Sequence, residues 1–564
     1  MSAQPWIKSY PPGLKWDVAI EAKPLYAVLD DAVANYPDNW CLDFMGKRLT
    51  YREVGNLVAR AAAGFQRLGV GKGVKVGLFL PNCPQYVVSY YGILKAGGTV
   101  VNYSPLYAER ELIHQIEDSH TDIMVTLNLK ALLPKMEQML VQSRLKKLII
   151  GTMSEVLPFP KNLLFPLVKR GDIQTYAPDD RHLSFKWLTE NDGNFATPAI
   201  DPRKDVALLQ YTGGTTGVPK GAMLTHYNLY CNTQQSTMWF TNVDLGRERV
   251  LGVLPFFHVF AMTGVMNMGL NIGAEIVMHP RFELEAVLKD INTKKPTLMP
   301  GVPTMFVAIN NHPRLKEFDL RSLKGCITGG APMPLEVRDS FEKTSGATLI
   351  EGYGLTESSP TASCNPLVGV RKAGSIGIPM PGTSIEIVDR DDPMKPMPIG
   401  QPGQICIRGP QVMAGYWQKP EATAATVIDG KLLTGDVGYM DEDGYTFIID
   451  RMKDMILVGG FNVFPRNVEE AIYQHPAVEE CTVIGIPDDY LGQVPKAFLK
   501  LKAGNNISTE SLMEFLKDRL GKHELPRFIE VRDALPKTMI GKLSKKELVE
   551  EEKKKHEDRK KAKA

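Results

Sequence analysis

The sequence has almost no net charge, no paired cysteines and no unbroken apolar run. Its 66 Lys and Arg residues against 64 Asp and Glu leave a net charge of +2, so nothing indicates a nucleic acid as partner. The seven cysteines are scattered, without a CxxC pair or zinc-ligand spacing, which favours reduced thiols and a cytoplasmic location. The first residues lack the apolar core of a signal peptide.

The longest apolar run, residues 259–278, is interrupted in a way that argues against a membrane span. It contains several glycines, Asn267, Asn271 and the charged Glu275. A helix facing lipid tolerates such a composition poorly. We expect this segment to be an interior helix followed by a strand.

At 564 residues the chain is too long for one hydrophobic core, so at least two domains are expected. Short β-rich runs alternate with helical patterns, which predicts an α/β fold with largely parallel sheets covered by helices. The predicted strands lie at residues 74–80, 123–127, 147–150, 206–209 and 275–278.

The pattern changes in the second half of the chain. Residues 374–449 hold short strands with many Gly and Pro turns, which indicates a small barrel-like or antiparallel subdomain. After residue 450 a compact α+β pattern begins. We therefore expect a large N-terminal domain of mixed and parallel sheets (1–450), a small mobile C-terminal domain (451–550) and a charged tail (551–564).

The most informative segment is the glycine-rich loop from Tyr211 to Gly221. It places four glycines, three threonines and Lys220 directly after an apolar strand. Glycines let backbone N–H groups point into a concavity that suits anions. The spacing differs from a Walker A loop, because two residues separate Gly217 from Lys220. A flexible surface turn is the alternative, but the combination favours phosphate binding.

Four other segments offer groups that a nucleotide needs. Glu357 follows a strand and a glycine turn and could hold Mg²⁺, which prefers oxygen ligands. Asp436 sits in a tight turn, where an Asx turn is the ordinary reading. Arg451 could bind ribose or phosphate, or form an interdomain ion pair. Lys542 follows a glycine turn far along the chain, and could equally be a surface lysine.

Three segments could contact apolar partners. Residues 255–260, with His258, could line a pocket for a hydrophobic substrate or pack in the core. Residues 157–170 combine apolar side chains with flanking cations and prolines, which fits either interfacial membrane docking or ordinary packing against the domain. The charged tail, residues 553–564, is either a solvated helix or a weak tether to anionic lipid.

In this order, the segments resemble the adenylate-forming superfamily, which includes acyl-CoA synthetases, aryl-CoA ligases, luciferases and adenylation domains of peptide synthetases. The resemblance covers nearly the whole chain. Residues 429–469 are similar to the fatty-acyl-CoA synthetase signature, and residues 212–217, 255–260 and 301–306 look like bacterial long-chain-fatty-acid–CoA ligases.

The resemblance implies a role for each candidate residue. The pyrophosphate of ATP would be held by Thr212, Gly213, Gly214, Thr215, Thr216, Gly217 and Lys220. Adenine and ribose would be bound by Gly330, Ala331, Pro332, Gly352, Tyr353, Asp436 and Arg451. The catalytic residues would be Thr356, Glu357 and Lys542, with Glu357 and Thr212 on Mg²⁺. Lys453 would be the hinge, Gly459 and Gly460 would border the CoA channel, and His258, Met262 and Gly301 would line the acyl pocket.

The implied activity is ligation of a medium- or long-chain fatty acid to coenzyme A, with ATP and CoA as co-substrates and Mg²⁺ as cofactor. An aryl-CoA ligase of the 4-coumarate type and a fatty-acyl-AMP ligase without CoA transfer are the alternatives. Among proteins that are not enzymes, the alternatives are a catalytically silent nucleotide sensor and a membrane-docked binding protein. Met262 stands where some long-chain synthetases have a tryptophan gate, which leaves chain length open. The oligomeric state is open too, and a homodimer is one candidate. Peripheral contact with the inner face of the cell membrane is a further open possibility.

Overall fold

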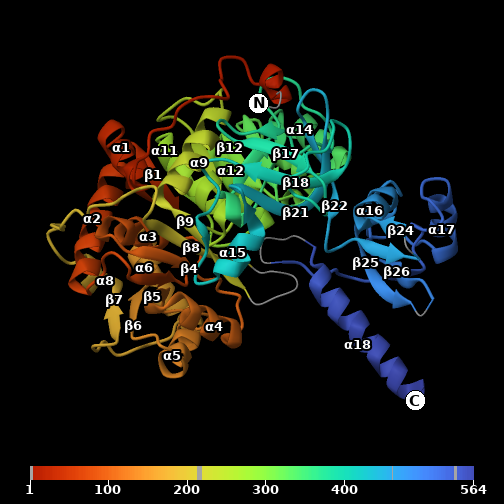
Figure 1. Ribbon diagram of the computed structural model, residues 1–564. Coiled ribbons are helices and arrows are strands. Elements are labelled where there is room, and N and C mark those ends of the chain that lie inside the picture. The colour runs from red at the N-terminus through yellow and green to blue at the C-terminus, as the bar shows by residue number, and fades with distance from the viewer. Residues whose placement is uncertain (1–3, 213–218, 460, 489, 539–542, 564) are drawn as a thin grey trace. The chain divides into compact units, whose positions relative to one another are not determined.

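The computed structural model describes residues 4–212, 219–459, 461–488, 490–538 and 543–563 (Figure 1). It divides into two compact units, Met1–Ser384 with Ile407–Leu432, and Ile385–Cys406 with Leu433–Ala564. This division does not run at residue 450, because residues 385–406 and 433–450 group with the C-terminal part of the chain. The predicted domain boundary at residue 450 stays a prediction.

The first unit contains an eight-stranded sheet of order β19-β9-β8-β4-β3-β5-β6-β7. Strands β8, β4, β3, β5, β6 and β7 run parallel, while β9 is antiparallel to both of its neighbours. The bounds are β3 Lys75–Leu78, β4 Thr99–Asn102, β5 Thr121–Leu127, β6 Lys147–Gly151, β7 His182–Ser184, β8 Val206–Thr212, β9 Lys220–Thr225 and β19 Gly415–Tyr416.

The same unit contains a nine-stranded sheet of order β16-β15-β14-β13-β12-β10-β11-β1-β2. Its central strands, from β14 to β1, are parallel, and antiparallel strands close both edges. The bounds are β1 Trp40–Phe44, β2 Lys47–Thr50, β10 Arg249–Gly252, β11 Glu275–Met278, β12 Leu298–Gly301, β13 Gly325–Gly329, β14 Thr348–Gly354, β15 Thr361–Cys364 and β16 Ile378–Pro379.

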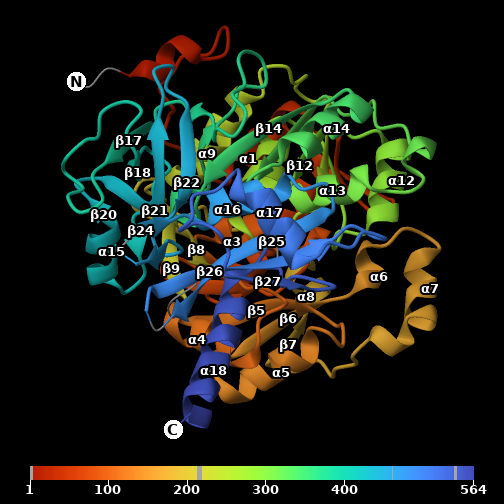
Figure 2. The same ribbon diagram turned by 90° about the vertical axis from the view of Figure 1, so that its right-hand side faces the viewer.

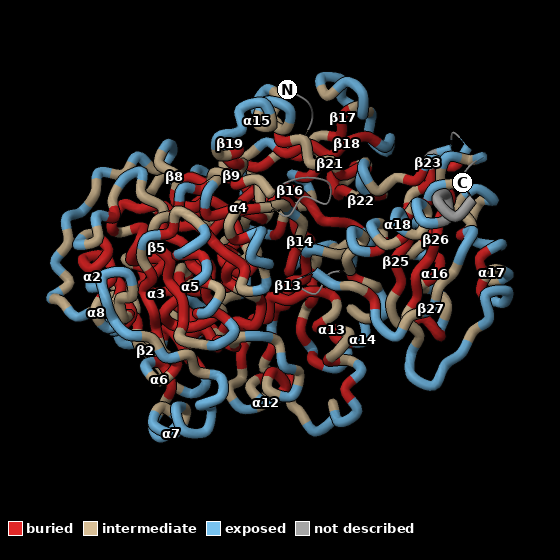
Figure 3. Tube along the Cα trace, turned by 90° about the horizontal axis from the view of Figure 1, so that it is seen from below, coloured by how far each residue is buried: buried red, intermediate tan, exposed pale blue. Residues whose placement is uncertain are grey.

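Helices pack on both sheets, and the strands between them are the most deeply buried part of the chain (Figure 3). Helices α3 and α8 contact the eight-stranded sheet and pack with α2, while α4 and α5 contact β5. The bounds are α1 Ala27–Asn35, α2 Tyr51–Arg67, α3 Pro84–Ala96, α4 Glu109–Ser119, α5 Leu133–Gln142, α6 Met153–Val156, α7 Lys161–Val168, α8 Phe185–Thr189, α9 His226–Trp239, α10 Val259–Ala261, α11 Met268–Asn271, α12 Leu284–Lys294, α13 Pro303–Asn310, α14 Leu335–Ser345 and α15 Pro420–Thr426.

Local sequence explains how α2 starts and how closely it packs. Thr50 and Glu53 form a capping box, which satisfies backbone N–H groups at the helix start. A Cβ on Gly64 would lie 2.1 Å from the carbonyl oxygen of Leu188, the residue next to the last of α8. Only glycine therefore allows α2 to lie this close to α8.

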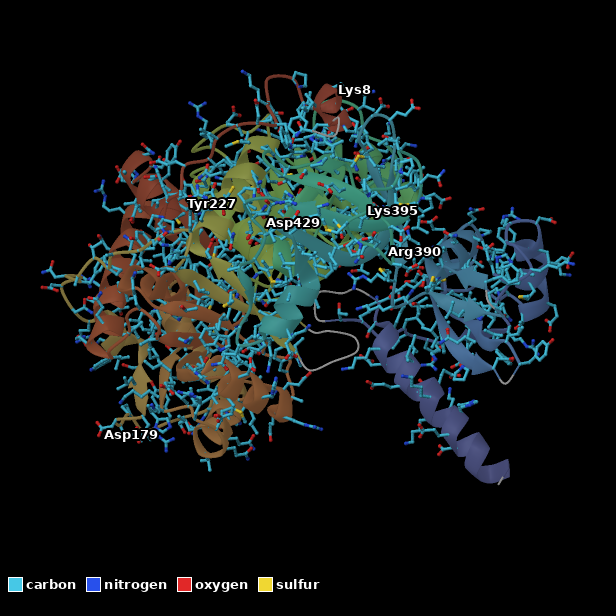
Figure 4. The ribbon with its side chains drawn as sticks, in the orientation of Figure 1. Lys8, Asp179, Tyr227, Arg390, Lys395 and Asp429 are labelled. Atoms are coloured by element: carbon cyan, nitrogen blue, oxygen red, sulfur yellow. The ribbon has the colours of Figure 1, made fainter. Side chains whose placement is uncertain are left out.

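The second unit holds most of a five-stranded sheet of order β17-β18-β21-β20, with β22 paired to β21. The division between the units crosses β17, β18 and β21, and β20 belongs to the first unit. The bounds are β17 Ser384–Val388, β18 Gly403–Arg408, β20 Val427–Ile428, β21 Lys431–Met440 and β22 Thr446–Arg451. In the first unit, the turn from β20 to β21 contains Asp429 (Figure 4). Its carboxylate lies 3.2 Å from the guanidinium of Arg408.

The C-terminal part of the second unit is a sheet of order β24-β23-β26-β25, with β27 paired to β26. Helices α16 and α18 contact β25. The bounds are β23 Ile456–Val458, β24 Phe461–Val463, α16 Pro465–Tyr473, β25 Val478–Asp488, β26 Gly492–Leu501, α17 Thr509–Lys517, β27 Phe528–Val531 and α18 Lys545–Lys563.

The predicted mixed α/β class is confirmed, with the predicted strands at β3, β5, β6, β8 and β11. The run 259–278 is an interior helical segment followed by β11, as expected, but residues Met262–Asn267 form a π-helix that the sequence did not indicate. The seven cysteines are buried free thiols. In the part of the chain that the structure describes, no helix combines the length and apolarity needed to cross a membrane.

Candidate active site

The glycine-rich loop joins two antiparallel strands. Thr212 ends β8 and is paired with Lys220, the first residue of β9, and its Oγ1 donates to the Lys220 carbonyl oxygen at 3.5 Å. The hairpin therefore places Thr212 and Lys220, one on each side of the loop, beside each other. The predicted phosphate-binding residues Gly213, Gly214, Thr215, Thr216 and Gly217 lie outside the described residues.

A buried tyrosine anchors this hairpin to α4. The Tyr211 hydroxyl donates to Asp118 Oδ2 at 2.5 Å, and burial, followed by that carboxylate, raises the pKa of Tyr211. The backbone carbonyl of Asp118 also accepts from Trp417 Nε1 at 2.9 Å. Asp118 thus connects α4 with the strand that leads into the loop and with the residue that follows β19.

Glu357, the predicted Mg²⁺ ligand, is bound by a tyrosine from β19. The Tyr416 hydroxyl donates to Glu357 Oε1 at 2.7 Å, and the Lys220 ammonium lies 4.5 Å from the Tyr416 ring centroid. Burial, and then the negative charge of Glu357, raise the pKa of Tyr416, so its hydroxyl remains a donor at neutral pH. The structure thus brings Lys220 and Glu357 to the same side chain.

Backbone hydrogen bonds and a tight turn hold the segment that contains Glu357. Thr356 and Glu357 form a short 3₁₀ turn, Thr356–Ser358, and the Glu357 carbonyl accepts from the Met413 N–H at 2.8 Å. A Cβ on Gly354 would lie 1.7 Å from the Pro360 carbonyl oxygen. Glycine at this position lets the chain turn back tightly, which places Glu357 close to the end of β14.

The residues predicted to frame adenine lie at the carboxyl ends of two neighbouring parallel strands. Gly352 on β14 is paired with Gly329 at the end of β13, and Tyr353 follows it on β14. Gly330 has φ of +86° and begins the partly exposed turn that contains Ala331 and Pro332. Ligands of open α/β sheets bind at such carboxyl ends.

In the second unit, the two predicted ribose ligands are bound to each other. Asp436 on β21 is paired with Arg451 on β22, and the guanidinium Nε lies 3.0 Å from Asp436 Oδ1. The Asp436 side chain is buried, whereas that of Arg451 is 47% exposed. The antiparallel register therefore presents a buried carboxylate held by a cation that solvent can reach.

The hinge and channel predictions fall in turns of the second unit. Lys453 lies in an exposed turn after β22, which the Asp454 N–H closes by donating to the Arg451 carbonyl at 3.1 Å. Gly459 has φ of +55° and follows β23. The predicted residues Gly460 and Lys542 lie outside the described residues.

Close after the predicted catalytic lysine in sequence, Lys545 forms a partly buried ion cluster. Its ammonium lies 3.0 Å from Glu469 Oε1, which also accepts from the Val483 N–H at 2.8 Å. Burial alone would lower the pKa of Lys545, but Glu469 and Asp450 raise it above its ordinary value. Burial raises the pKa of Asp450, which accepts from the Arg466 N–H at 2.9 Å.

An apolar crevice lies between α9, the π-helix and β15. Its cavity volume is about 10 Å³, about the smallest that can hold one water molecule. The residues lining it are Ser236, Trp239, Phe240, Phe260, Gly264, Met268, Ile327, Thr361, Cys364 and Met380.

The three predicted acyl-pocket residues are not among those that line this crevice. His258 caps α10 through Nδ1, which accepts from the Phe260 N–H at 3.3 Å. Met262 is buried at the start of the π-helix, two residues from the crevice-lining Gly264. Gly301 ends β12 against the ring of Phe306.

Three features of the first unit are typical of nucleotide-binding enzymes. They are the strand hairpin with its glycine-rich loop, the nearby carboxylate, and the glycine turns at the ends of parallel strands. The chain belongs to the AMP-binding enzyme family: the family model matches residues 29–417, and that of the AMP-binding enzyme C-terminal domain matches residues 467–542. These are the adenylate-forming enzymes that the sequence resembles.

A curated relative is the long-chain-fatty-acid–CoA ligase of Bacillus subtilis (strain 168), 44% identical over 98% of this chain and 99% of that protein. Among solved structures, ATP-bound MatB from Rhodopseudomonas palustris is 26% identical with a TM-score of 0.82, covering 93% of this chain and 98% of that one. The anthranilate CoA ligase AuaEII in complex with anthranoyl-AMP is 26% identical with a TM-score of 0.83, covering 95% and 98%.

Sequence reasoning missed Tyr416 and Trp239. Tyr416 is 59 positions from Glu357, and no motif marked it. Trp239 is the last residue of α9, a helix in which most residues, apolar and polar alike, are buried. The sequence of α9 therefore shows no amphipathic pattern that would distinguish a face lining a pocket from a face packed in the core. Spatial neighbours of this kind are visible only in the folded chain.

Proposed function

We propose that this protein joins a medium- or long-chain fatty acid to coenzyme A in an ATP-dependent reaction through an acyl-AMP intermediate, releasing AMP and pyrophosphate. The observation that carries the proposal is the 44% identity, over nearly the whole of both chains, to a protein named long-chain-fatty-acid–CoA ligase. The location of Lys220, Tyr416 and Glu357 beside one another supports it.

The donor set fits Mg²⁺ brought in with ATP rather than a metal held by protein alone. Among the described residues, no group of three or more His, Cys, Asp or Glu is placed to hold a metal ion. Mg²⁺ commonly binds one or two carboxylates together with substrate phosphates. Glu357, with the Thr212 hydroxyl, would hold it, and the ion would offset the phosphate charge that an attacking carboxylate must approach.

The chain's own groups have distinct tasks in this proposal. Lys220 and the loop amides would neutralise the departing pyrophosphate, and Lys542 would stabilise charge on the α-phosphate. Thr356 would contact the α-phosphate, and Tyr353 with residues 330–332 would hold adenine. Asp436, oriented by Arg451, would accept hydrogen bonds from the ribose hydroxyls. Rotation about Lys453 would then exchange Lys542 for the CoA channel beside Gly459 and Gly460.

The apolar crevice is the site that we assign to the alkyl chain of the substrate. Its lining is mostly apolar and includes two methionines, Met268 and Met380, whose flexible side chains can rearrange around a chain. A free volume of about 10 Å³ means that these side chains would have to move to admit even a short chain. His258, Met262 and Gly301 remain predicted parts of the acyl pocket.

One assay separates this proposal from its rivals. Pyrophosphate release is measured with ATP, Mg²⁺ and fatty acids from C6 to C18 or a cinnamate, with and without CoA. We expect sustained release with C10–C18 acids only when CoA is present. Preference for cinnamate would instead identify an aryl-CoA ligase, turnover independent of CoA an acyl-AMP ligase, and no release with any acid a nucleotide sensor.

The cellular location and assembly belong to the proposal as well. The seven free thiols suit a reducing cytoplasm. A homodimer remains a prediction, which sedimentation of the full chain would test.

A further inference from the structure

Helix α7 is an apolar helix with none of its residues buried. It follows β6 and the short helix α6 and lies at the periphery of the first unit, where Figure 2 draws it in gold. Five large apolar side chains in or just before it are solvent-exposed: Phe159 80%, Leu163 62%, Leu164 49%, Leu167 74% and Val168 74%. Apolar side chains clustered this way usually mark an interaction site.

The helix is held in place at its base. Thr152 caps α6 by accepting from the Glu155 N–H, and Met153, Val156 and Leu157 are buried. Lys161 Nζ donates to the carbonyl of Met45, in the turn between β1 and β2, at 3.2 Å. Because α6 is anchored in the core and α7 contacts α6, the exposed apolar side chains belong to a helix that is attached to the first unit.

The apolar side chains share one side of the helix. Successive residues turn about 100° around a helix axis, so Leu163, Leu164, Leu167 and Val168, all within α7, fall within an arc of about 140°. Met45, beside the start of the helix, is 42% exposed.

Cations flank this apolar side. Lys161, Lys169 and Arg170 are exposed, against one nearby acid in the segment, Asp172, which lies 3.7 Å from Lys169. Three cations and one carboxylate give the segment 157–172 a net charge of +2. An exposed ion pair of that length contributes little binding energy, so Lys169 can also bind other anions. Anionic headgroups complement such a rim.

We propose that α7 is a membrane-docking element whose apolar side enters the acyl boundary of a bilayer while Lys161, Lys169 and Arg170 bind anionic headgroups. An eight-residue helix is about 12 Å long. That is too short to bury the roughly 800 Å² per partner of a stable protein interface, but it is sufficient to insert a few side chains into a bilayer. The tail from residue 553 has only alanine as apolar residue, so it has nothing to insert.

The inference does not depend on the proposed ligase activity, because docking is measured without substrates. Full-length protein is mixed with vesicles of phosphatidylcholine and phosphatidylglycerol, or of phosphatidylcholine alone, and bound protein is separated by flotation. The test variant is Leu163→Glu with Leu167→Glu. The matched control, Leu106→Glu with Val141→Glu, changes two residues of similar exposure (67% and 82%) elsewhere in the same unit.

We expect the test variant to lose at least tenfold in partitioning to anionic vesicles, with the control unchanged. Binding of the unaltered protein should fall severalfold in 0.5 M salt and on pure phosphatidylcholine, because the headgroup contacts are electrostatic. A Phe159→Trp reporter should be quenched by brominated lipid, which places the helix directly in the bilayer. Equal thermal unfolding of all variants confirms that folding is unaffected.

Three results would overturn the proposal. The first is equal partitioning of the test variant and the unaltered protein. The second is an unquenched reporter on vesicles that bind the protein. The third is a protein that ignores vesicles but changes from dimer to monomer in the test variant, which would assign α7 to a second copy of the chain.

Discussion

The hydroxyl of Tyr416 lies 2.7 Å from Oε1 of Glu357, and its ring lies 4.5 Å from the ammonium of Lys220. One side chain from β19 therefore contacts both the carboxylate predicted to hold Mg²⁺ and the lysine predicted to bind phosphate. A donor on one oxygen of a carboxylate restricts its rotation, so Tyr416 orients Glu357 before ATP arrives.

Substituting Tyr416→Phe should raise the Mg²⁺ concentration needed for half-maximal adenylation about tenfold, since a hydrogen bond to a charged group contributes about 1.5–3 kcal/mol. Glu357→Gln should lower the adenylation rate by about 10²–10³. Pyrophosphate exchange measured across a Mg²⁺ titration checks both. An unchanged Mg²⁺ midpoint in Tyr416→Phe would mean that the tyrosine only packs against the site.

Substituting Arg451→Gln should raise the KM for ATP about tenfold or more, because Asp436 loses the cation that orients it. The matched control is Arg408→Gln, which breaks the comparable pair with Asp429 at 3.2 Å and should leave the KM unchanged. If Arg451→Gln lowers thermal stability but not ATP affinity, the pair is structural and the ribose assignment fails.

Substituting Lys542→Ala should reduce acyl-AMP formation by about 10²–10³ while thioester formation from supplied acyl-AMP continues. The reason is that only the first half-reaction passes through a five-coordinate α-phosphate, whose charge Lys542 would stabilise, whereas the thiol of CoA attacks the acyl carbon. Lys537→Ala is a control in the same segment, since its side chain is paired with Glu480. Equal loss of both half-reactions in Lys542→Ala would contradict the assignment.

Substituting Gly264→Ile should shorten the preferred acyl chain, because the new side chain would fill the apolar crevice beside Phe260. We expect kcat/KM for a C16 acid to fall at least tenfold relative to C8, since each excluded methylene is worth about 0.8 kcal/mol. Gly264→Ala, whose Cβ would lie 3.4 Å from the Phe260 ring, should have an intermediate effect. A chain-length profile unaffected by either substitution would place the acyl pocket elsewhere.

His226, the first residue of α9, should destabilise the fold in acid. Burial lowers its pKa to about 4, and its Nδ1 accepts from the Leu25 N–H at 3.1 Å, which requires the neutral ring. Its folded pKa is below the unfolded value of about 6.5, so its stability contribution is complete above pH 6.5 and is lost as the pH falls through about 4. The total is about 3 kcal/mol.

Denaturant unfolding between pH 7.5 and 4 measures this contribution. In His226→Asn, a side chain that does not titrate, the decline should be smaller by that amount. Equal acid sensitivity in both proteins would show that His226 does not titrate with the fold.

Much of the fold could be predicted from local pattern. Strands such as Glu275–Met278 are short apolar runs between helical segments, and buried parallel strands need no alternation. The glycine loop, Glu357 and Asp436 could be predicted as site residues because the motifs that indicate them are runs of contiguous residues. The π-helix at Met262–Asn267 was not, because its extra residue per turn depends on what packs around it.

The sequence by itself determined the class of fold, the family and the chemical groups available for catalysis, since these depend on residue types and their local order. The tertiary structure alone decided that Tyr416 binds Glu357, that Arg451 pairs with Asp436 and that Leu163 and Leu167 face solvent. Each of these facts joins residues distant in sequence, or depends on what covers a surface, and only the packing of the whole chain sets which side chains meet.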